Sequence, residues 1–388
     1  MAKSTPKFRV ALAGLILLVV LASFTAHIST WKPSTNKQSM IVKEQNPEVS
    51  GRILIYVNNK LVYNGPVHSF LKPVPTMLAL GLFPTSGFRS ASVNFYGDPP
   101  NAWTSASSYA GTQFITFFYG DFASDWSVWG MRATIAPILA IYDTKGNKWT
   151  EISLSTTPSI TSNNTGILLL ISGSVTPSLD AATNVSMIRL IRPTGNSGAL
   201  NAAEMAIRIA EDTLSTPVTV NPGDSLTVVY QFYFKSGQVF TENWAEAFFA
   251  WLYNVPGAKV NITVTDGSTD YIDPYASDVG NTATNVPVNT YIVIGNGPAS
   301  FSRTAYKVAN EVARAEPSVQ VYTGGVSLSY AFTFNKDTTI TEVAVYSKLR
   351  DGKEVMLLYY VLPQPVTVKA GVPFTVTFYI NLPYEDRV

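Results

Sequence analysis

One short pattern occurs twice in this chain of 388 residues. Pro-Val-Thr-Val-x-x-Gly starts at Pro217 and again at Pro365, and each copy continues into a further alternating apolar run. The runs upstream of the two copies, residues 184–191 and 339–346, are also alike. The copies lie about 150 residues apart, near the commonest domain size. This spacing predicts that one β-domain has been duplicated.

Each copy of the pattern has a local structural meaning. Gly223 and Gly371 follow an alternating run, where glycine supplies the positive φ that a tight turn requires. Pro217 and Pro365 cannot donate to a strand ladder, so we expect them at strand starts or on an edge strand. The copies differ in the preceding loop, which is longer at residues 192–202 than at residues 348–353. Loops of this kind often carry binding functions.

The rest of the body indicates an all-β fold. Short alternating runs, such as residues 260–265, 326–334 and 375–380, are each followed by Gly, Asn or Asp. Two apolar runs flank Asn58-Asn59-Lys60 and predict a hairpin. We therefore expect two tandem antiparallel β-sandwich domains, jelly-roll-like, at residues 51–236 and 237–388, with one or two short helices. The choice between jelly-roll and immunoglobulin-like topology stays open.

A helix is predicted after residue 241. Thr241 is a suitable N-cap, and four apolar residues at i, i+4, i+7 and i+8 form one face: Trp244, Phe248, Trp251 and Leu252. The simplest interpretation is a plug that buries a sandwich end or the joint between domains. The alternative is an aromatic helix that binds a membrane or a receptor. A second helix is predicted over residues 302–314.

The N-terminus has the pattern of an export signal. Basic residues precede a run of about 17 apolar residues, at the short end for a spanning helix. Residues 1–29 are predicted to be a signal anchor or a signal peptide, and the length of the run favours an anchor. Residues 30–50 are polar and predict a linker. The predicted membrane residues are Val10, Leu12, Leu15, Ile16, Leu17, Leu18, Val19, Val20 and Leu21.

Composition narrows the setting and the chemistry. Charged residues make up only 14% of the chain, which indicates an uncharged β surface in an extracellular or assembled protein. The net charge of +1 gives no electrostatic argument for binding nucleic acid. The chain has no cysteine and two histidines, so disulfides, thiolate sites and histidine-rich metal sites are excluded. Neither histidine stands in a catalytic-triad motif.

Three further features are candidate sites. Asp266, Asp270 and Asp273 could hold a structural Ca²⁺, although the favoured interpretation is that they are solvated acids in a turn. Asn163, Asn184 and Asn261 begin glycosylation sequons. The aromatic segment 103–129 could stack on sugars, although such residues are more often core. No other cofactor is expected.

Part of the second copy resembles a module of virion structural proteins of phages and archaeal viruses. The likeness is carried by residues 292–297, 302–306, 339–346 and 361–371. It implies a β-sandwich of the kind used in spikes, fibres, turrets or minor capsid proteins, with a structural role and no catalysis. The membrane segment departs from many such proteins and would suit a virion that contains a membrane.

The function predicted from these features is a non-enzymatic structural or attachment protein of a virion surface. It would associate with itself and with other virion or envelope proteins. Its N-terminal helix would anchor it in the membrane, and its loops would be presented to host glycans or proteins. The first alternative is an archaeal or bacterial cell-surface filament or envelope protein assembled by strand addition. The second is a carbohydrate-binding module. The expected location is the virion surface, or the cell surface and exterior.

Overall fold

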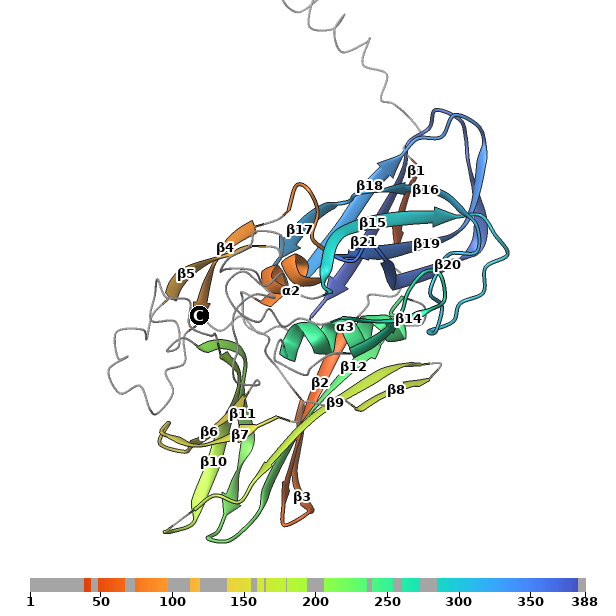
Figure 1. Cartoon of the computed structure of the whole chain (residues 1–388). Helices are drawn as coiled ribbons and strands as arrows, with labels where there is room; N and C mark the ends of the chain where they lie inside the picture. Colours follow the sequence, from red (N-terminus) through yellow and green to blue (C-terminus); the bar gives the residue numbers. More distant parts are fainter. Residues whose placement is uncertain are drawn as a thin grey trace, which may run out of the picture.

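The protein is all-β, as the sequence predicts, with two helices among the described residues (Figure 1). A computed structural model describes residues 38–42, 48–66, 74–88, 90–96, 112–118, 138–154, 159–163, 165–178, 180–193, 206–235, 239–253, 260–272 and 285–382. The strands form antiparallel sheets apart from two parallel pairings at the N-terminal segment.

The largest sheet joins the two halves of the chain. Its first part has the order β8-β9-β12-β2-β3, with β8 (Ser159–Asn163), β9 (Gly166–Val175), β12 (Leu226–Lys235), β2 (Glu48–Val57) and β3 (Lys60–Pro66). Its second part has the order β17-β18-β21-β1, with β17 (Ser318–Tyr322), β18 (Gly325–Phe332), β21 (Phe374–Asn381) and β1 (Gln38–Val42). The parts meet at Glu48, which pairs with Lys235 on one side and with Asn381 on the other.

Two four-stranded sheets share one strand order. The first is β11-β10-β6-β7, with β11 (Ala206–Val220), β10 (Thr183–Pro193), β6 (Ile138–Asp143) and β7 (Lys148–Ser153). The second is β20-β19-β15-β16, with β20 (Glu354–Val368), β19 (Thr338–Leu349), β15 (Pro287–Gly295) and β16 (Glu311–Ala315). Strands β6 to β12, with β2 and β3, are called the first strand set below. Strands β15 to β21, with β1, are the second strand set.

The remaining elements are short. Two hairpins stand apart from the larger sheets: β4 (Ser90–Tyr96) with β5 (Thr112–Phe118), and β13 (Val260–Thr263) with β14 (Thr269–Ile272). The helices are α2 (Val74–Leu82) and α3 (Glu242–Tyr253). Helix α3 lies between the two strand sets, with β12 and β9 on one side and β20 on the other (Figure 1).

The repeated sequence pattern forms the same irregularity in both strand sets. Val185 pairs with Val218 and Met187 with Thr213, so one residue of β10 faces four residues of β11, 214–217. In β19 and β20, Ile340 pairs with Val366 and Glu342 with Val361, and residues 362–365 bulge in the same way. The leucine of each bulge, Leu214 and Leu362, is buried.

The repeated prolines and glycines stand where the sequence places them. Pro217 and Pro365 are exposed, and each lies in the outermost strand of its four-stranded sheet among the described strands. Gly223 has φ 84° and Gly371 has φ 73°, which confirms the predicted left-handed turns. The predicted hairpin at Asn58 and Asn59 is also confirmed, because both residues have positive φ between β2 and β3.

A hydrophobic core runs through both strand sets. Strand β12 shows how the alternating sequence builds it, since every second residue from Leu226 to Phe234 is buried. Strand β7 packs on β9 in the first set, and β15 and β16 pack on β18 in the second. Buried residues of α2, α3 and both sets belong to one cluster. The predicted boundaries at residues 50/51 and 236/237 stay predictions.

Two sequence predictions differ from the structure. The helix predicted over residues 302–314 is wrong: these residues form turns and then begin β16, which pairs with β15. The backbone N–H groups of Val308 and Ala309 are bound by side chains of β19, so helical hydrogen bonds do not form there. Strand β1 lies inside residues 30–50, where a linker without strands was expected.

Candidate functional site

Helix α3 is fixed at its start by buried polar contacts. Thr241 caps the helix as predicted, because its Oγ1 accepts a 3.2 Å hydrogen bond from the backbone N–H of Trp244. The same hydroxyl lies 2.9 Å from the carbonyl oxygen of Leu357 in β20. Asn243 exchanges two 2.9 Å hydrogen bonds with the backbone of Thr263 in β13. The cap therefore ties α3 to two strands of the C-terminal half.

The predicted plug residues form an aromatic core around α3. Their side chains are fully buried: Trp244, Phe248, Trp251 and Leu252. Trp244 stacks on Phe83 beyond α2, with ring centroids 5.8 Å apart, and meets Phe234 of β12 edge-on. A Cβ added at Gly81 would lie 2.4 Å from Trp251, so glycine permits the close approach of α2 to α3. None of these four side chains is available to a membrane or a receptor.

Arg303 connects the two strand sets. Its Nε donates a 2.6 Å hydrogen bond to the carbonyl of Asn163, at the end of β8, and its Nη1 donates to the carbonyl of Phe240, just before α3. The backbone carbonyl of Arg303 accepts a 2.8 Å bond from the N–H of Glu242. The hydroxyl of Ser162 bonds the Glu242 carboxylate. Burial lowers the pKa of the Arg303 guanidinium.

A buried carboxylate holds the loop that carries Arg303. Glu342 is fully buried, and its oxygens accept hydrogen bonds from the Tyr359 hydroxyl at 2.7 Å and from the Ala309 N–H at 2.8 Å. The Tyr346 hydroxyl accepts a 2.7 Å bond from the Val308 N–H. Burial raises the pKa values of both tyrosines. A Cβ at Gly295 would lie 2.5 Å from Glu342, so this contact requires glycine.

The contacts of Arg303 and Glu342 give a structural role to residues that carry the viral resemblance. Gly295, Arg303, Glu342 and Tyr346 all belong to the segments on which that resemblance is based. Glu342 and Tyr346 bind the backbone of the loop at residues 296–310, and Gly295 leaves room for Glu342. Arg303 then fixes the same loop to β8. The site is therefore a mechanical joint built from buried polar pairs.

The two copies of the glycine turn lie at opposite ends of the molecule. Lys235 and Asn381, the last residues of β12 and β21, both pair with Glu48, where the two parts of the largest sheet meet. The turns at Gly223 and Gly371 precede these strands and therefore lie away from Glu48 in opposite directions (Figure 1). These are called the Gly223 end and the Gly371 end. Gln38 pairs with Phe374, so β1 starts at the Gly371 end.

Polar side chains order the turns at the Gly223 end. Asn58 donates a 2.6 Å hydrogen bond to Asp224 and accepts one of 2.9 Å from the Ser225 N–H. A hydrogen bond from the backbone of Asn221, with the Asn58 contact, lowers the pKa of Asp224. The hairpin that carries Asn58 also exposes two neighbouring apolar residues, Leu61 at 45% and Val62 at 44%. This end thus presents a fixed polar turn beside exposed apolar groups.

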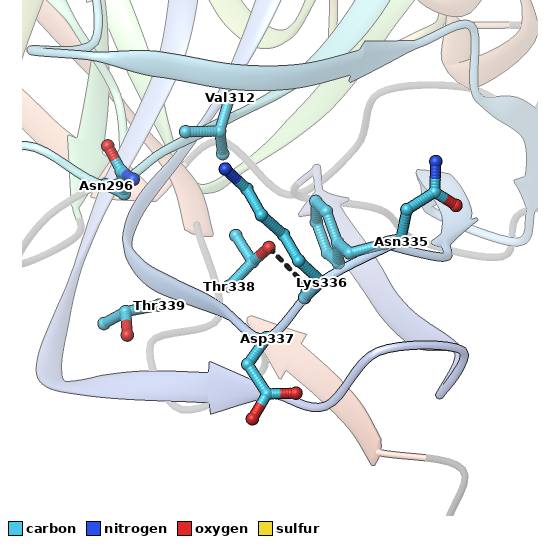
Figure 2. Close-up of a pocket in the computed structure, with 8 residues that line it drawn as sticks. Asn296, Val312, Asn335, Lys336, Asp337, Thr338 and Thr339 are labelled. Carbon is cyan, nitrogen blue, oxygen red and sulfur yellow. Dashed lines mark hydrogen bonds between the residues drawn. The ribbon is translucent and has the colours of Figure 1, made fainter.

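A cavity of about 650 Å³ opens at the Gly371 end. Figure 2 shows its lining residues: Asn296, Val312, Phe334, Asn335, Lys336, Asp337, Thr338 and Thr339. Thr338 bonds the backbone carbonyl of Lys336 at 2.9 Å, while Asp337 pairs with Lys369 at 2.7 Å. Most of the lining residues come from one loop and the strand that follows it, and they form no recognisable catalytic arrangement.

Two of the three predicted calcium residues, Asp266 and Asp270, lie in the described part of the chain. Asp270 lies 2.8 Å from Lys353, and Asp266 accepts a 2.7 Å hydrogen bond from the N–H of Ser268 within its own turn. Asp273 lies outside the described residues. Across the described ranges, no group of three acidic, histidine or cysteine side chains is arranged to hold a metal ion. The calcium site stays a prediction.

The other predicted site residues have mixed outcomes. Asn163, Asn184 and Asn261 are exposed, and Asn163 orders its own sequon by accepting a 2.8 Å bond from the Thr165 N–H. Their glycosylation stays a prediction. The predicted membrane residues 10–21, most of the loop at 192–202 and most of the segment 103–129 lie outside the described residues. No helix in the described part of the chain is long and apolar enough to cross a bilayer.

The sequence did not predict the joint. Arg303 and Glu342 lie in the segments that carry the viral resemblance. A lone carboxylate in an apolar strand such as Thr-Glu-Val-Ala-Val-Tyr is nevertheless a signal of a buried polar pair. Comparison with known proteins adds no name for the arrangement. No protein-family model matches the chain, and no significantly similar curated protein or solved structure was found.

Proposed function

We propose that this chain is a non-enzymatic structural and attachment protein of a virion surface. In this proposal each strand set is one antiparallel β-sandwich, and the two arose by duplication. The observation that supports the proposal is the joint. Arg303 and Glu342 lie in the segments that resemble virion modules, and their buried hydrogen bonds link the two strand sets. Rigidity of this kind suits a spike or turret that projects from a surface.

The orientation of the chain supports an attachment role. Since β1 starts at the Gly371 end, a membrane anchor in residues 10–26 would leave the body at that end. The Gly223 end would then face outward and present Asn58, Asn59 and the exposed pair Leu61 and Val62. Partly apolar turns held on rigid strands are suited to contact host proteins or glycans.

The first experiment locates the chain. Native particles and host envelopes are purified separately and analysed by mass spectrometry, with an antibody to the exposed hairpin at Asn59 for gold labelling. Recovery of the chain in particles, with labels on the outer surface, supports the proposal. Recovery in host envelopes alone overturns it and favours the cell-surface alternative. An intact peptide from residues 1–30 in that material shows that the N-terminal segment is retained.

The second experiment tests the orientation. The double variant L61S/V62S changes the Gly223 end, and the matched variant K336S changes an exposed residue of the Gly371 end. We expect the first to reduce host binding at least tenfold with particle assembly unchanged, and the second to leave binding unchanged. Equal host binding by the wild type, L61S/V62S and K336S would contradict attachment through the Gly223 end.

A further inference from the structure

Among the described strands, one edge of β21 is not paired by any of strands β15 to β20. One side pairs with β18 over the full length of β21. The other side is covered by β1 through five registered pairs and by β2 through the single pair of Glu48 with Asn381. The corresponding strand β12 has ten registered pairs with β2 on that side. The edge of β21 is therefore completed by a short strand from the far end of the sequence.

Strand β1 is held differently from the other strands of this sheet. It runs parallel to β21, so no hairpin joins the two, and 331 residues separate Val42 from Phe374. The connection from β1 to β2 consists of residues 43–47. Such a strand depends on main-chain pairing with its acceptor and can be supplied by any chain that brings the same segment to the edge.

The length of the connection permits pairing within one chain and between two chains. Val42 lies opposite Phe378 and Glu48 opposite Asn381, three residues apart along β21, or about 10 Å. Six Cα steps separate Val42 from Glu48, and an extended chain of that length spans about 20 Å. The connection is thus about twice as long as pairing within one chain requires. Where two copies lie side by side in an assembly, this extra length lets β1 of one copy pair with β21 of its neighbour.

We infer that β21 is a strand-acceptor edge and that residues 38–42 of a second copy of this chain occupy it in the assembled protein. The exchange replaces the pairing of β1 with β21 of its own chain by the same five-residue pairing with β21 of another copy. No registered pair is lost, and each copy is linked to the next. This inference rests on the proposed function as an assembling surface protein. It adds the contact through which the copies join.

The absence of cysteine from the chain makes the test direct. Ser39 pairs with Thr375, and Thr375 is half-buried between the inward-facing residues Phe374 and Val376, so it lies on the outer face of the sheet. Full-length chains carrying S39C and T375C, with tags of different size, are co-expressed in one cell, purified in detergent and oxidised. We expect a disulfide-linked dimer containing both tags, with the predicted linked peptide in mass spectrometry.

Two controls make every outcome informative. The pair S39C and K60C uses an exposed residue at the Gly223 end and should give at most a tenth of the linked product. The double variant S39C/T375C should give covalent multimers that reducing agent dissolves. A double variant that closes only within single chains, with no mixed dimer from the single variants, overturns the inference. Failure to form either disulfide also overturns it, because β1 then does not pair with β21.

The result separates the inference from the proposed function. If the chain is found in particles but no mixed dimer forms, the function stands and the exchange is wrong. If mixed dimers form but the chain occurs only in host envelopes, the copies join by strand exchange in a cellular filament or envelope instead.

Discussion

Arg303 reaches across the joint to the backbone of Asn163, 140 residues earlier in the chain, through a 2.6 Å hydrogen bond from Nε to the carbonyl oxygen. Arg303 is 7% exposed, and its second donor satisfies the carbonyl of Phe240. A charged donor that satisfies two backbone carbonyls is worth more than a surface ion pair, because its loss leaves the carbonyls without a partner. This contact links the two strand sets directly.

Removal of the arginine tests the joint. We expect R303A to lower the free energy of unfolding by about 2–4 kcal/mol, since it leaves two backbone carbonyls without their donor. K307A removes a positive charge from an exposed position of the same loop. It should change the free energy of unfolding by less than about 0.5 kcal/mol. Urea unfolding of both variants gives the comparison. Equal stability of the two variants would show that the joint does not depend on Arg303.

The buried carboxylate gives a second prediction. Y359F removes the hydroxyl that donates to Glu342 and should destabilise the fold by about 1–3 kcal/mol, because a buried carboxylate oxygen loses its partner. Tyr330 is 39% exposed, so Y330F serves as the control and should be close to neutral. Thermal unfolding followed by circular dichroism measures both. A neutral Y359F would mean that water replaces the hydroxyl.

The aromatic core predicts a difference between two substitutions of one residue. The indole N–H of Trp244 is buried and has no hydrogen-bond partner among the residues that the structure describes. W244A should cost about 3–5 kcal/mol through the cavity that it leaves. W244F loses part of the ring but also removes the unsatisfied donor, whose burial is unfavourable by about 1–3 kcal/mol. We therefore expect the free energy of unfolding of W244F to be close to that of the wild type. Similar losses of stability in W244F and W244A, measured by urea unfolding, would contradict this.

Stability should fall as the pH rises toward neutrality because of Glu246. Burial, with the charge of Glu242 in addition, raises the pKa of Glu246 from 4.5 to about 7. The folded state therefore holds a proton that the unfolded state has lost between these values. Its contribution is fully present below pH 4.5 and is lost as the pH passes 7. It amounts to about 1–3 kcal/mol.

The matched variant isolates this carboxyl from other titrating groups. E246Q should be about as stable as the wild type at pH 4.5 and more stable at pH 8, with a smaller slope between them. Urea unfolding of both proteins at half-unit intervals measures the difference. Parallel curves across the whole range would show that Glu246 titrates normally.

The repeated glycines predict equal effects at the two ends of the molecule. G223A and G371A place a side chain at φ 84° and φ 73°, which costs about 1–2 kcal/mol although nothing lies within 4 Å of the new Cβ. Gly87 has equally open surroundings without a positive φ, so G87A should be neutral or slightly stabilising. Chemical unfolding of the three variants tests this. A stable G371A would show that the turn can change its conformation.

The repeat and its turns were predictable because they depend on local chemistry. A positive φ at Gly223, a two-residue hairpin at Asn58 and a capped apolar face after Thr241 each follow from a few neighbouring residues. The alternation in β12 likewise gives its buried face directly. The bulge at residues 214–217 was not predicted, because it is defined only by the register of a partner strand.

The joint was not predictable for the same reason. The loop at residues 302–310 has a helix-like pattern, but Glu342 and Tyr346, more than 30 residues away, bind its backbone N–H groups. Strand β1 contains only a three-residue apolar run, Met40-Ile41-Val42, which is too short to predict a strand without the edge of β21. Both depend on tertiary partners that local propensity does not contain.

The direction of β1 also determines how the molecule would respond to mechanical force. Because β1 runs parallel to β21 and begins at the Gly371 end, tension that pulls Gln38 away from the body at that end acts along the strand axis. The five registered pairs are then loaded together in shear, whereas a strand pulled at right angles to its axis would open one pair at a time. Whichever copy supplies β1, the body resists being pulled from its attachment through the whole length of that strand.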